Sequence, residues 1–394
     1  MSDKPEVDGF TNKDLNTEGT KAAATSVDFA FDFPKLREAF KKPDEEAAAA
    51  RLVSRIIGVT GVLLVLAALM LASAGPMLGH GATVTHDEAP AARNAAAAVQ
   101  PAAAPHAVAK RPQLSNQEKL IGSVAAVMGL LGTAMGLYGM GRGSPRHRWL
   151  RARLKTETLR LFQFHYLAAR LPEIVSNAFD PEWRKRFEKE REEMLEEVQQ
   201  KLLADPDKEL ARITKGKGET TFESFIQPQP ASLSSVNSKV EEDAIAAWRE
   251  LRLGWQETYV KTKLLHKDKR GLTARGKEHL FAVIGWACVG LIIFLHLLHF
   301  LGVLAEWPIG LMEMAVIWTA LVALAGRALE DGYAPHREVE RYEQYEGNIR
   351  VAIERFEEAQ GFAAKLEVAR AFERTSLEEM RVFIRTQAKT RFLL

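Results

Sequence analysis

The sequence contains a single cysteine, Cys288, among its 394 residues. One cysteine cannot form an intramolecular disulfide, and it excludes the usual structural zinc sites, which need several thiolates. Aromatic residues are also scarce, at 8% of the chain. Neither sign of charge dominates, because 53 Lys and Arg stand against 51 Asp and Glu, for a formal net charge of +2. That balance argues against nucleic-acid binding through bulk positive charge and leaves only local basic patches for such contacts.

The motifs of the common enzyme classes are missing as well. The sequence has no Walker loop, no dinucleotide-binding glycine motif, no zinc-protease motif, no nucleophile elbow and no protein-kinase signature set. His266 and His279 lack helical ligand spacing to a second histidine or carboxylate, so we predict no metal site and no cofactor. No apolar–polar alternation is long enough to predict a sheet. The sequence therefore predicts an all-α protein that is not an enzyme.

Four long apolar runs are the main positive feature. They cover about residues 53–75, 120–141, 281–304 and 308–327. Each is about 20 residues long, which is enough to cross a hydrocarbon core of ~30 Å. A buried core helix is the alternative for any one run, but four runs of this length argue against it. We predict an all-α integral membrane protein with four transmembrane helices in two pairs and long cytoplasmic helices.

Basic residues flank the runs on one side only. The positive-inside rule places this side in the cytoplasm, together with both termini. A cleaved signal peptide is not expected, because about 50 mostly polar residues precede the first run. The flanking basic residues are Lys41, Lys42, Arg51 and Arg55; Arg142, Arg146, Arg148, Arg151 and Arg153; Lys267, Lys269, Arg270, Arg275 and Lys277; and Arg327, Arg337 and Arg341.

The chain divides into five segments on this basis. Within them, Ser144 and Pro145 predict a helix start, Asp180 and Pro181 a break, and Pro335 an interruption after the last run. A loose repeat is visible, since each half has an approach helix, two apolar runs and a charged helix. The first segment (1–52) is a disordered N-terminus with a cytoplasmic approach helix, and the second (53–141) is a transmembrane pair with an Ala/Pro-rich outer loop at 76–119. The third (142–280) is a cytoplasmic helical domain with a mobile excursion at about 214–238. The fourth (281–329) is a second transmembrane pair, and the fifth (330–394) is a C-terminal cytoplasmic helical segment.

The second apolar run carries a stripe of small residues. Its members recur every seven residues in two interleaved series, so they lie along one helix face. Such faces let helices approach closely in lipid. One interpretation is packing within the chain against the first run, which has Gly58 and Gly61; the other is a seam between copies or a pore wall. The stripe consists of Gly122, Ala125, Gly129, Gly132, Gly136 and Gly139.

Three polar residues lie inside the last two runs. His299 precedes the turn at Ala305–Pro308 by about five residues and Glu313 follows it by about five, so they could meet at one depth. His296 lies nearly one turn before His299, on almost the same face. Ionisable residues within membrane helices usually face a protein interior or a water-filled path. A packed, hydrogen-bonded pair without a role in conduction is the equal alternative.

A basic patch follows the second run. Attachment to the membrane surface is the commoner role of such patches. Capture of an anionic ligand, such as a cyclic nucleotide or an oligonucleotide, is the second interpretation. The residues concerned are Arg146, Arg148, Arg151, Arg153 and Arg160.

Short motifs beside the apolar runs resemble one known family. ArgLeuLysThrGluThrLeuArgLeuPhe at Arg153–Phe162, TrpGlnGluThrTyr at Trp255–Tyr259 and GluArgTyrGluGlnTyr in the C-terminal helix are similar to stretches of the SLATT family (SMODS and SLOG-associating two-transmembrane effectors). Thr156 departs from the alanine usual in that family. The resemblance implies an effector of bacterial conflict systems in the inner membrane, forming a pore when a partner enzyme signals infection.

Three functions account for these features of the sequence to different degrees. A homo-oligomeric pore or ion-channel effector of an antiphage system, gated through its cytoplasmic helices, accounts for the stripe, for the polar residues within the runs and for the resemblance. A non-conducting membrane scaffold that recruits cytoplasmic partners is the alternative. A membrane enzyme or transporter is disfavoured, because no catalytic set is found and four spans are few for a secondary transporter.

Overall fold

The computed structural model describes residues 15, 25–79, 116–141, 143–201, 203–216, 238–265, 273–304, 309–390 and 392. Over these residues the chain is helical, and no strand occurs among them. The all-α prediction is confirmed for this part of the chain. Nearly all of the predicted disordered N-terminus, most of the outer loop and most of the excursion at 214–238 lie outside the described residues.

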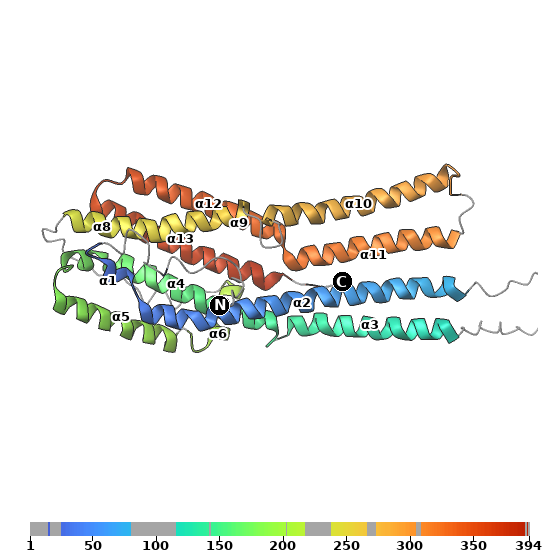
Figure 1. Ribbon diagram of the computed structural model, residues 1–394, viewed down its shortest axis with the longest axis horizontal. Coiled ribbons are helices and arrows are strands. Elements are labelled where there is room, and N and C mark those ends of the chain that lie inside the picture. Colours follow the sequence, from blue (N-terminus) through green and yellow to red (C-terminus); the bar gives the residue numbers. More distant parts are fainter. Residues whose placement is uncertain are drawn as a thin grey trace, which may run out of the picture.

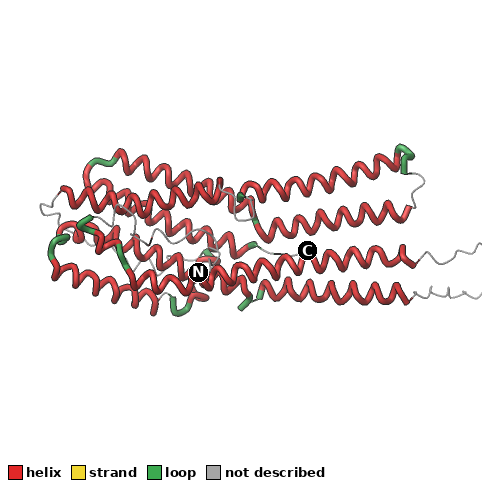
Figure 2. Tube along the Cα trace, in the orientation of Figure 1, coloured by secondary structure: helices red, strands yellow, loops and turns green. Residues whose placement is uncertain are grey.

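The helices follow one another along the chain as Figures 1 and 2 show. In chain order they are α1 (Asp28–Phe31), α2 (Pro34–Gly79), α3 (Asn116–Met140), α4 (Pro145–Ser176), α5 (Pro181–Lys201), α6 (Pro206–Lys215), α8 (Ser238–Trp248), the π-helix η3 (Arg249–Gly254), α9 (Trp255–Leu265), α10 (Ala274–Phe300), α11 (Ile309–Tyr333), α12 (Pro335–Glu358) and α13 (Gly361–Lys389).

Four helices are long and apolar enough to cross a membrane, as predicted. We call the apolar part of α2, with α3, α10 and α11, the apolar helices. α2 packs against α3 and also against α11, and α11 packs against α10. The helices therefore lie in the order α3, α2, α11, α10, extending together from one end of the molecule (Figure 1). This row leaves large apolar side chains exposed along α3 and α10, among them Leu130, Trp286 and Phe294.

The first apolar helix is longer than the sequence boundaries suggested. We expected an approach helix that ends near residue 52, but α2 runs without a break for 46 residues, from Pro34 to Gly79. At about 1.5 Å per residue it is about 69 Å long. Alanines at 47–50 favour helix and supply no stop signal between the charged and apolar parts. The boundary at 52 and 53 thus falls inside a single helix.

Local chemistry sets the helix starts after each apolar pair. Ser144 caps α4, where its hydroxyl accepts a hydrogen bond from the His147 amide at 3.1 Å, and Pro145 occupies the first turn. α12 begins at Pro335, after Ala334 adopts a left-handed conformation with φ of 45°. Proline prevents α11 from continuing straight into α12, because it lacks an amide hydrogen and clashes with the preceding turn. Both predicted helix starts are confirmed.

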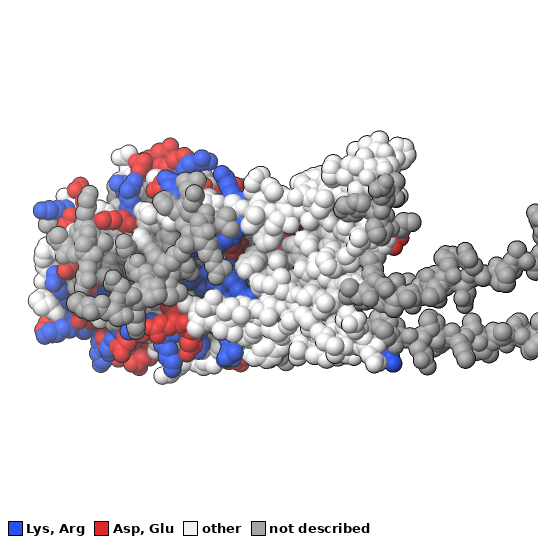
Figure 3. All heavy atoms as spheres, turned by 45° about the vertical axis from the view of Figure 1, so that its right-hand side comes forward, with Lys and Arg blue, Asp and Glu red and all other residues white. Residues whose placement is uncertain are grey.

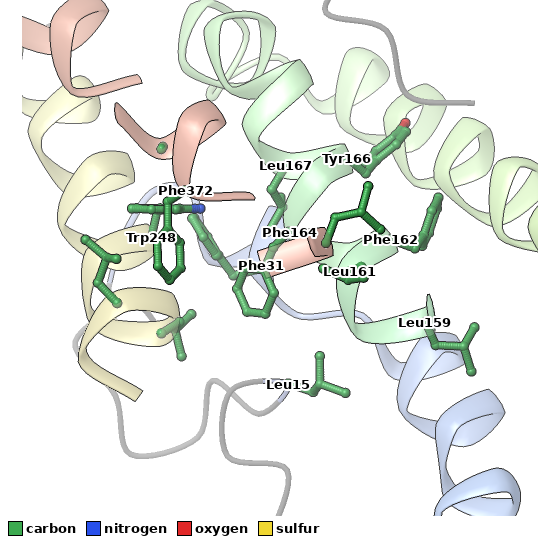
Figure 4. Close-up of a cluster of buried hydrophobic side chains, with 14 of the residues drawn as sticks. Leu15, Phe31, Leu159, Leu161, Phe162, Phe164, Tyr166, Leu167, Trp248 and Phe372 are labelled. Carbon is green, nitrogen blue, oxygen red and sulfur yellow. The ribbon is translucent and has the colours of Figure 1, made fainter. Parts of the chain in front are cut away.

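The other helices form a domain around one hydrophobic core. Trp248 and Phe372 come from α8 and α13, Phe164 from α4 and Phe31 from α1, and Figure 4 shows these side chains gathered together. All four are at most 2% exposed. Segments from both ends of the chain therefore complete the same core.

Arg191 of α5 holds the N-terminal segment in this core. Its guanidinium is 3% exposed and donates to the carbonyls of Ala30 at 2.6 Å and Asp32 at 3.1 Å. It also lies 4.0 Å from the centroid of the Phe33 ring. Burial lowers the pKa of Arg191 to about 10, which still leaves it charged at neutral pH.

Candidate functional site at the junction of the apolar helices and the helical domain

Charged side chains gather over the helical domain, whereas the apolar helices are almost free of them in the view of Figure 3. The predicted site residues lie along the apolar helices and at their junction with the domain.

The middle of the small-residue stripe packs within the chain. A Cβ atom added at Gly132 would lie 2.7 Å from Val65 Cγ2 and 2.8 Å from the Gly61 carbonyl oxygen of α2. A Cβ atom at Gly129 would lie 3.6 Å from that of Ala68. The α3 backbone therefore approaches α2 at glycine positions, as expected of small residues in lipid-facing pairs. At these positions the stripe makes a contact between two helices of one chain.

The remaining stripe residues differ from one another. Ala125 is buried, at 6% exposed, and the Gly136 amide would lie 3.6 Å from a Cβ atom at Gly61. Gly122 and Gly139 have open space where a Cβ atom would go. The stripe is thus a helix–helix contact in its middle and open at both ends.

The group nearest to Gly58 is not on α3, contrary to our expectation. A Cβ atom there would collide with the ring of Phe392, which follows α13. A Cβ atom at Gly332 of α11 would collide with the same ring. The ring therefore lies between α2 and α11, the central two helices of the row.

The three polar residues of α10 and α11 do not form the expected pair. His296, His299 and Glu313 are all exposed, and no hydrogen bond or ion pair joins His299 to Glu313 among the described residues. Glu313 begins an exposed stripe on α11 that continues through Ile317 and Leu324, which are 44% and 51% exposed. Spacings of four and seven residues place these side chains on one helix face. They therefore point away from the chain's own packed surfaces.

Four of the five candidate anion-binding arginines are engaged inside the chain. Arg146 donates to Thr390 Oγ1 at 2.6 Å, and Arg151 lies 3.2 Å from Asp207. Arg153 and Arg160 both pair with Glu157, at 2.5 and 3.1 Å. The fifth, Arg148, is exposed. An anionic ligand at this patch would have to compete with these internal partners.

A buried ion pair, which the sequence analysis missed, lies deeper in the domain. Arg252 donates to both carboxylate oxygens of Glu373, at 3.0 and 2.8 Å, and the two side chains are only 2% and 1% exposed. Arg252 belongs to the π-helix η3, a rare form that often marks functional positions. The available sequence signal was the position of Arg252 between Leu251 and Leu253. Glu373, 121 residues later, gave no hint of being its partner.

Neighbouring charges extend this pair into a network. Burial alone would raise the pKa of the Glu157 carboxyl, but Arg153, Arg160 and Arg252 together lower it below its ordinary value. Arg341 pairs with Glu379 across α12 and α13. Burial raises the pKa of Glu379 against the opposing effect of Arg341. The network thus joins α4, η3, α12 and α13 through charge-assisted contacts.

Ion pairs also connect the base of α10 to α12. His336 Nδ1 lies 2.8 Å from the Glu278 carboxylate, and Arg275 pairs with Glu343. A side-chain hydrogen bond to Glu278 raises the pKa of the His336 imidazole. Both pairs are exposed, so each contributes little to stability on its own. Their effect is to set where α12 meets α10.

No cluster of three or more His, Cys, Asp or Glu side chains that could hold a metal ion occurs in the part of the chain that the structure describes. Cys288 is buried and free. The site therefore consists of helix contacts, polar residues on the apolar helices and a charge network beneath them. Comparison of the chain with family models, with curated proteins and with solved structures finds no match.

Proposed function

We propose that the chain is one subunit of a homo-oligomeric pore or ion channel in a bacterial inner membrane, gated through its cytoplasmic helices. The four apolar helices cross the bilayer, and both termini lie in the cytoplasm. The setting of an antiphage effector is taken from the resemblance to the SLATT family. The trigger would be a signal such as a nucleotide or an oligonucleotide.

The observation that carries this proposal is the exposure of Glu313. A carboxylate on a membrane helix is costly when it faces lipid, so such residues usually face protein or water. Glu313 is exposed, and among the described residues no side chain pairs with it. A second copy, or a water-filled path between copies, would supply the missing polar surroundings. His296 and His299, also exposed, would lie near the same depth in the bilayer.

The arrangement of the apolar helices agrees with an assembly of several copies. The row α3, α2, α11, α10 has open faces and open edges, and exposed side chains lie on all four helices. Gating would follow from continuity, because α2 extends from the hydrophobic core of the domain into the bilayer as one helix. A change in the domain would therefore reach the membrane without a flexible linker.

The test combines assembly and flux. We expect the purified chain to form oligomers in nanodiscs and to conduct ions in planar bilayers, with candidate cyclic nucleotides and oligonucleotides added in turn. Glu313→Gln should change the ion preference or the pH response of the current while the oligomer stays the same size. Ile317→Leu, on the same exposed face, should change neither. A chain that stays monomeric in nanodiscs would contradict the pore.

A non-conducting scaffold is the second candidate. Phe179, on the turn between α4 and α5, is 67% exposed, and an exposed aromatic at the end of the domain away from the apolar helices suits a partner protein. Oligomers that carry no current under any of these conditions would favour this function.

A further inference from the structure

The last turn of α13 is attached to the start of α4. Thr390 is 4% exposed, and its hydroxyl accepts a hydrogen bond from Arg146 at 2.6 Å. Arg146 also donates to the Gln387 carbonyl. The C-terminal end of the domain is therefore fixed at the point where the chain leaves the first apolar pair.

Two residues later, the ring of Phe392 occupies a space that only glycines leave open. Gly58 of α2 and Gly332 of α11 both meet the ring, and a Cβ atom on either would come too close to it. Tyr333 contacts Phe392 edge to face, with centroids 5.4 Å apart. Val62 of α2 belongs to the small buried cluster against which Phe392 packs.

This contact is confined to one end of the α2–α11 seam. Near the other end, Trp318 Nε1 donates a hydrogen bond to Ser73 Oγ at 2.9 Å. Between the two lie the buried alanines Ala325 and Ala328. The helices are thus joined directly in their outer half and held apart by an aromatic ring at their inner end. Without the ring, two glycine faces would lie opposite each other, and such faces approach closely in lipid.

We propose that Phe392 is a wedge that sets the spacing of α2 and α11 at the inner end of the apolar helices. Because α13 carries the wedge, a shift of α13 within the domain would change this spacing. The inference deepens the proposed function by naming the element that passes movement from the domain to the apolar helices. Only the transmission of movement from the domain to the apolar helices rests on the proposed function, because the spacing of α2 and α11 can be measured without recording any current.

The experiment measures disulfide formation in the full-length chain in membranes, in a Cys288→Ala background. The reporting pair is Val62→Cys with Ala328→Cys, which belong to one buried cluster across the seam. The control pair is Ala68→Cys with Gly129→Cys between α2 and α3, where a Cβ atom at position 129 would lie 3.6 Å from that of Ala68. That separation suits a disulfide, and Phe392 does not touch this contact.

Phe392→Ala should raise the rate of disulfide formation in the reporting pair by roughly fivefold, which corresponds to about 1 kcal/mol. The control pair should keep its rate, which also shows that the chain has folded. Phe392→Tyr, which retains the ring, and Phe179→Ala, which removes an exposed ring elsewhere, should both behave like the parent. An unchanged or lower rate for the reporting pair would overturn the wedge. So would an equal rise for both pairs, because it would report a general loosening of the helices.

Discussion

The buried ion pair of Arg252 and Glu373 should have a large effect on the stability of the helical domain. Removing one partner of such a pair leaves an uncompensated charge in the core. We expect Arg252→Ala or Glu373→Ala to destabilise the helical domain by about 3–5 kcal/mol. The double variant Arg252→Met/Glu373→Leu should recover most of that loss, because both buried charges are gone. Tryptophan fluorescence during thermal unfolding in detergent would measure the effect. A double variant as unstable as the singles would contradict the account.

His165 should make the stability of the folded domain depend on pH. Its imidazole hydrogen-bonds to the Glu373 carbonyl at 3.0 Å, and burial, aided by Arg252, lowers its pKa from 6.5 to about 4. Between these pH values the unfolded state binds the extra proton and the folded state does not. Stability should therefore fall as the pH drops from 6.5 towards 4, by at most about 3 kcal/mol from this residue.

Replacing the imidazole tests this assignment. His165→Gln keeps a hydrogen-bond donor but cannot titrate, so thermal unfolding should depend less on pH across that window. His336→Gln provides the contrast. The pKa of His336 is raised, so its contribution is present below the pKa of 6.5 of the unfolded chain and is lost as the pH rises through the folded value. Equal flattening by both variants between pH 4 and 6.5 would count against His165.

Individual residues were the hardest to predict from the sequence. The polar residues inside the apolar runs stood out by type, but their exposure depends on how each helix is rotated, which no local pattern specifies. The arginines of α4 were predicted to attach to the membrane surface or to capture an anionic ligand, whereas Glu157 lies one turn from both Arg153 and Arg160 and pairs with them. The Arg252–Glu373 pair joins residues far apart in sequence, and sequence patterns report neighbours along a helix, not across the core.

At the scale of helices, the contact of α2 with α3 makes a sharp prediction. Gly132→Leu would push bulk against Val65 and the Gly61 carbonyl, and overpacking of this kind costs about 1–3 kcal/mol or more. Gly122→Leu makes the same change on the same helix where the space is open, so it should be tolerated. Thermal stability in detergent, followed by size-exclusion chromatography, would compare them. Equal tolerance of both leucines would contradict close packing at Gly132.

Helix ends were predicted better than helix junctions. Ser144, Pro145, Pro181 and Pro335 act through local backbone chemistry, and each lies at a helix start in the structure. The junction in α2 was missed because a change from charged to apolar residues alters what surrounds a helix without ending it. The contribution of Phe392 was also out of reach, since it depends on where the end of α13 comes to lie.

For the molecule as a whole, orientation in the membrane is the first property to test. Basic residues lie at the end of the apolar helices that joins the domain, so this end should be cytoplasmic. A cysteine at Ala97, between the first two apolar runs in sequence, should react with a membrane-impermeant reagent from the periplasm. A cysteine at Phe179, exposed on the domain, should react only after lysis. The reverse pattern would invert the topology.

The number of apolar helices was predictable because length and composition alone identify each of them. Their order in space was not. The sequence suggested two pairs, yet α2 also packs on α11, through alanines and a Trp318–Ser73 hydrogen bond that occur in no recognisable motif. Small residues lie along several faces of α2 and α11, so a sequence alone does not say which of these faces meet.

The shared core has a consequence for how the protein is made. Phe31 and Arg191 are synthesised before α13, which supplies Phe372 and Glu373. The first two apolar helices therefore emerge while the domain that joins them is still incomplete. Until α13 has emerged, Arg252 lacks the Glu373 carboxylate and Trp248 lacks the Phe372 side of its pocket. A chain cut short before α13 would still contain all four apolar helices but would leave the core of the domain open.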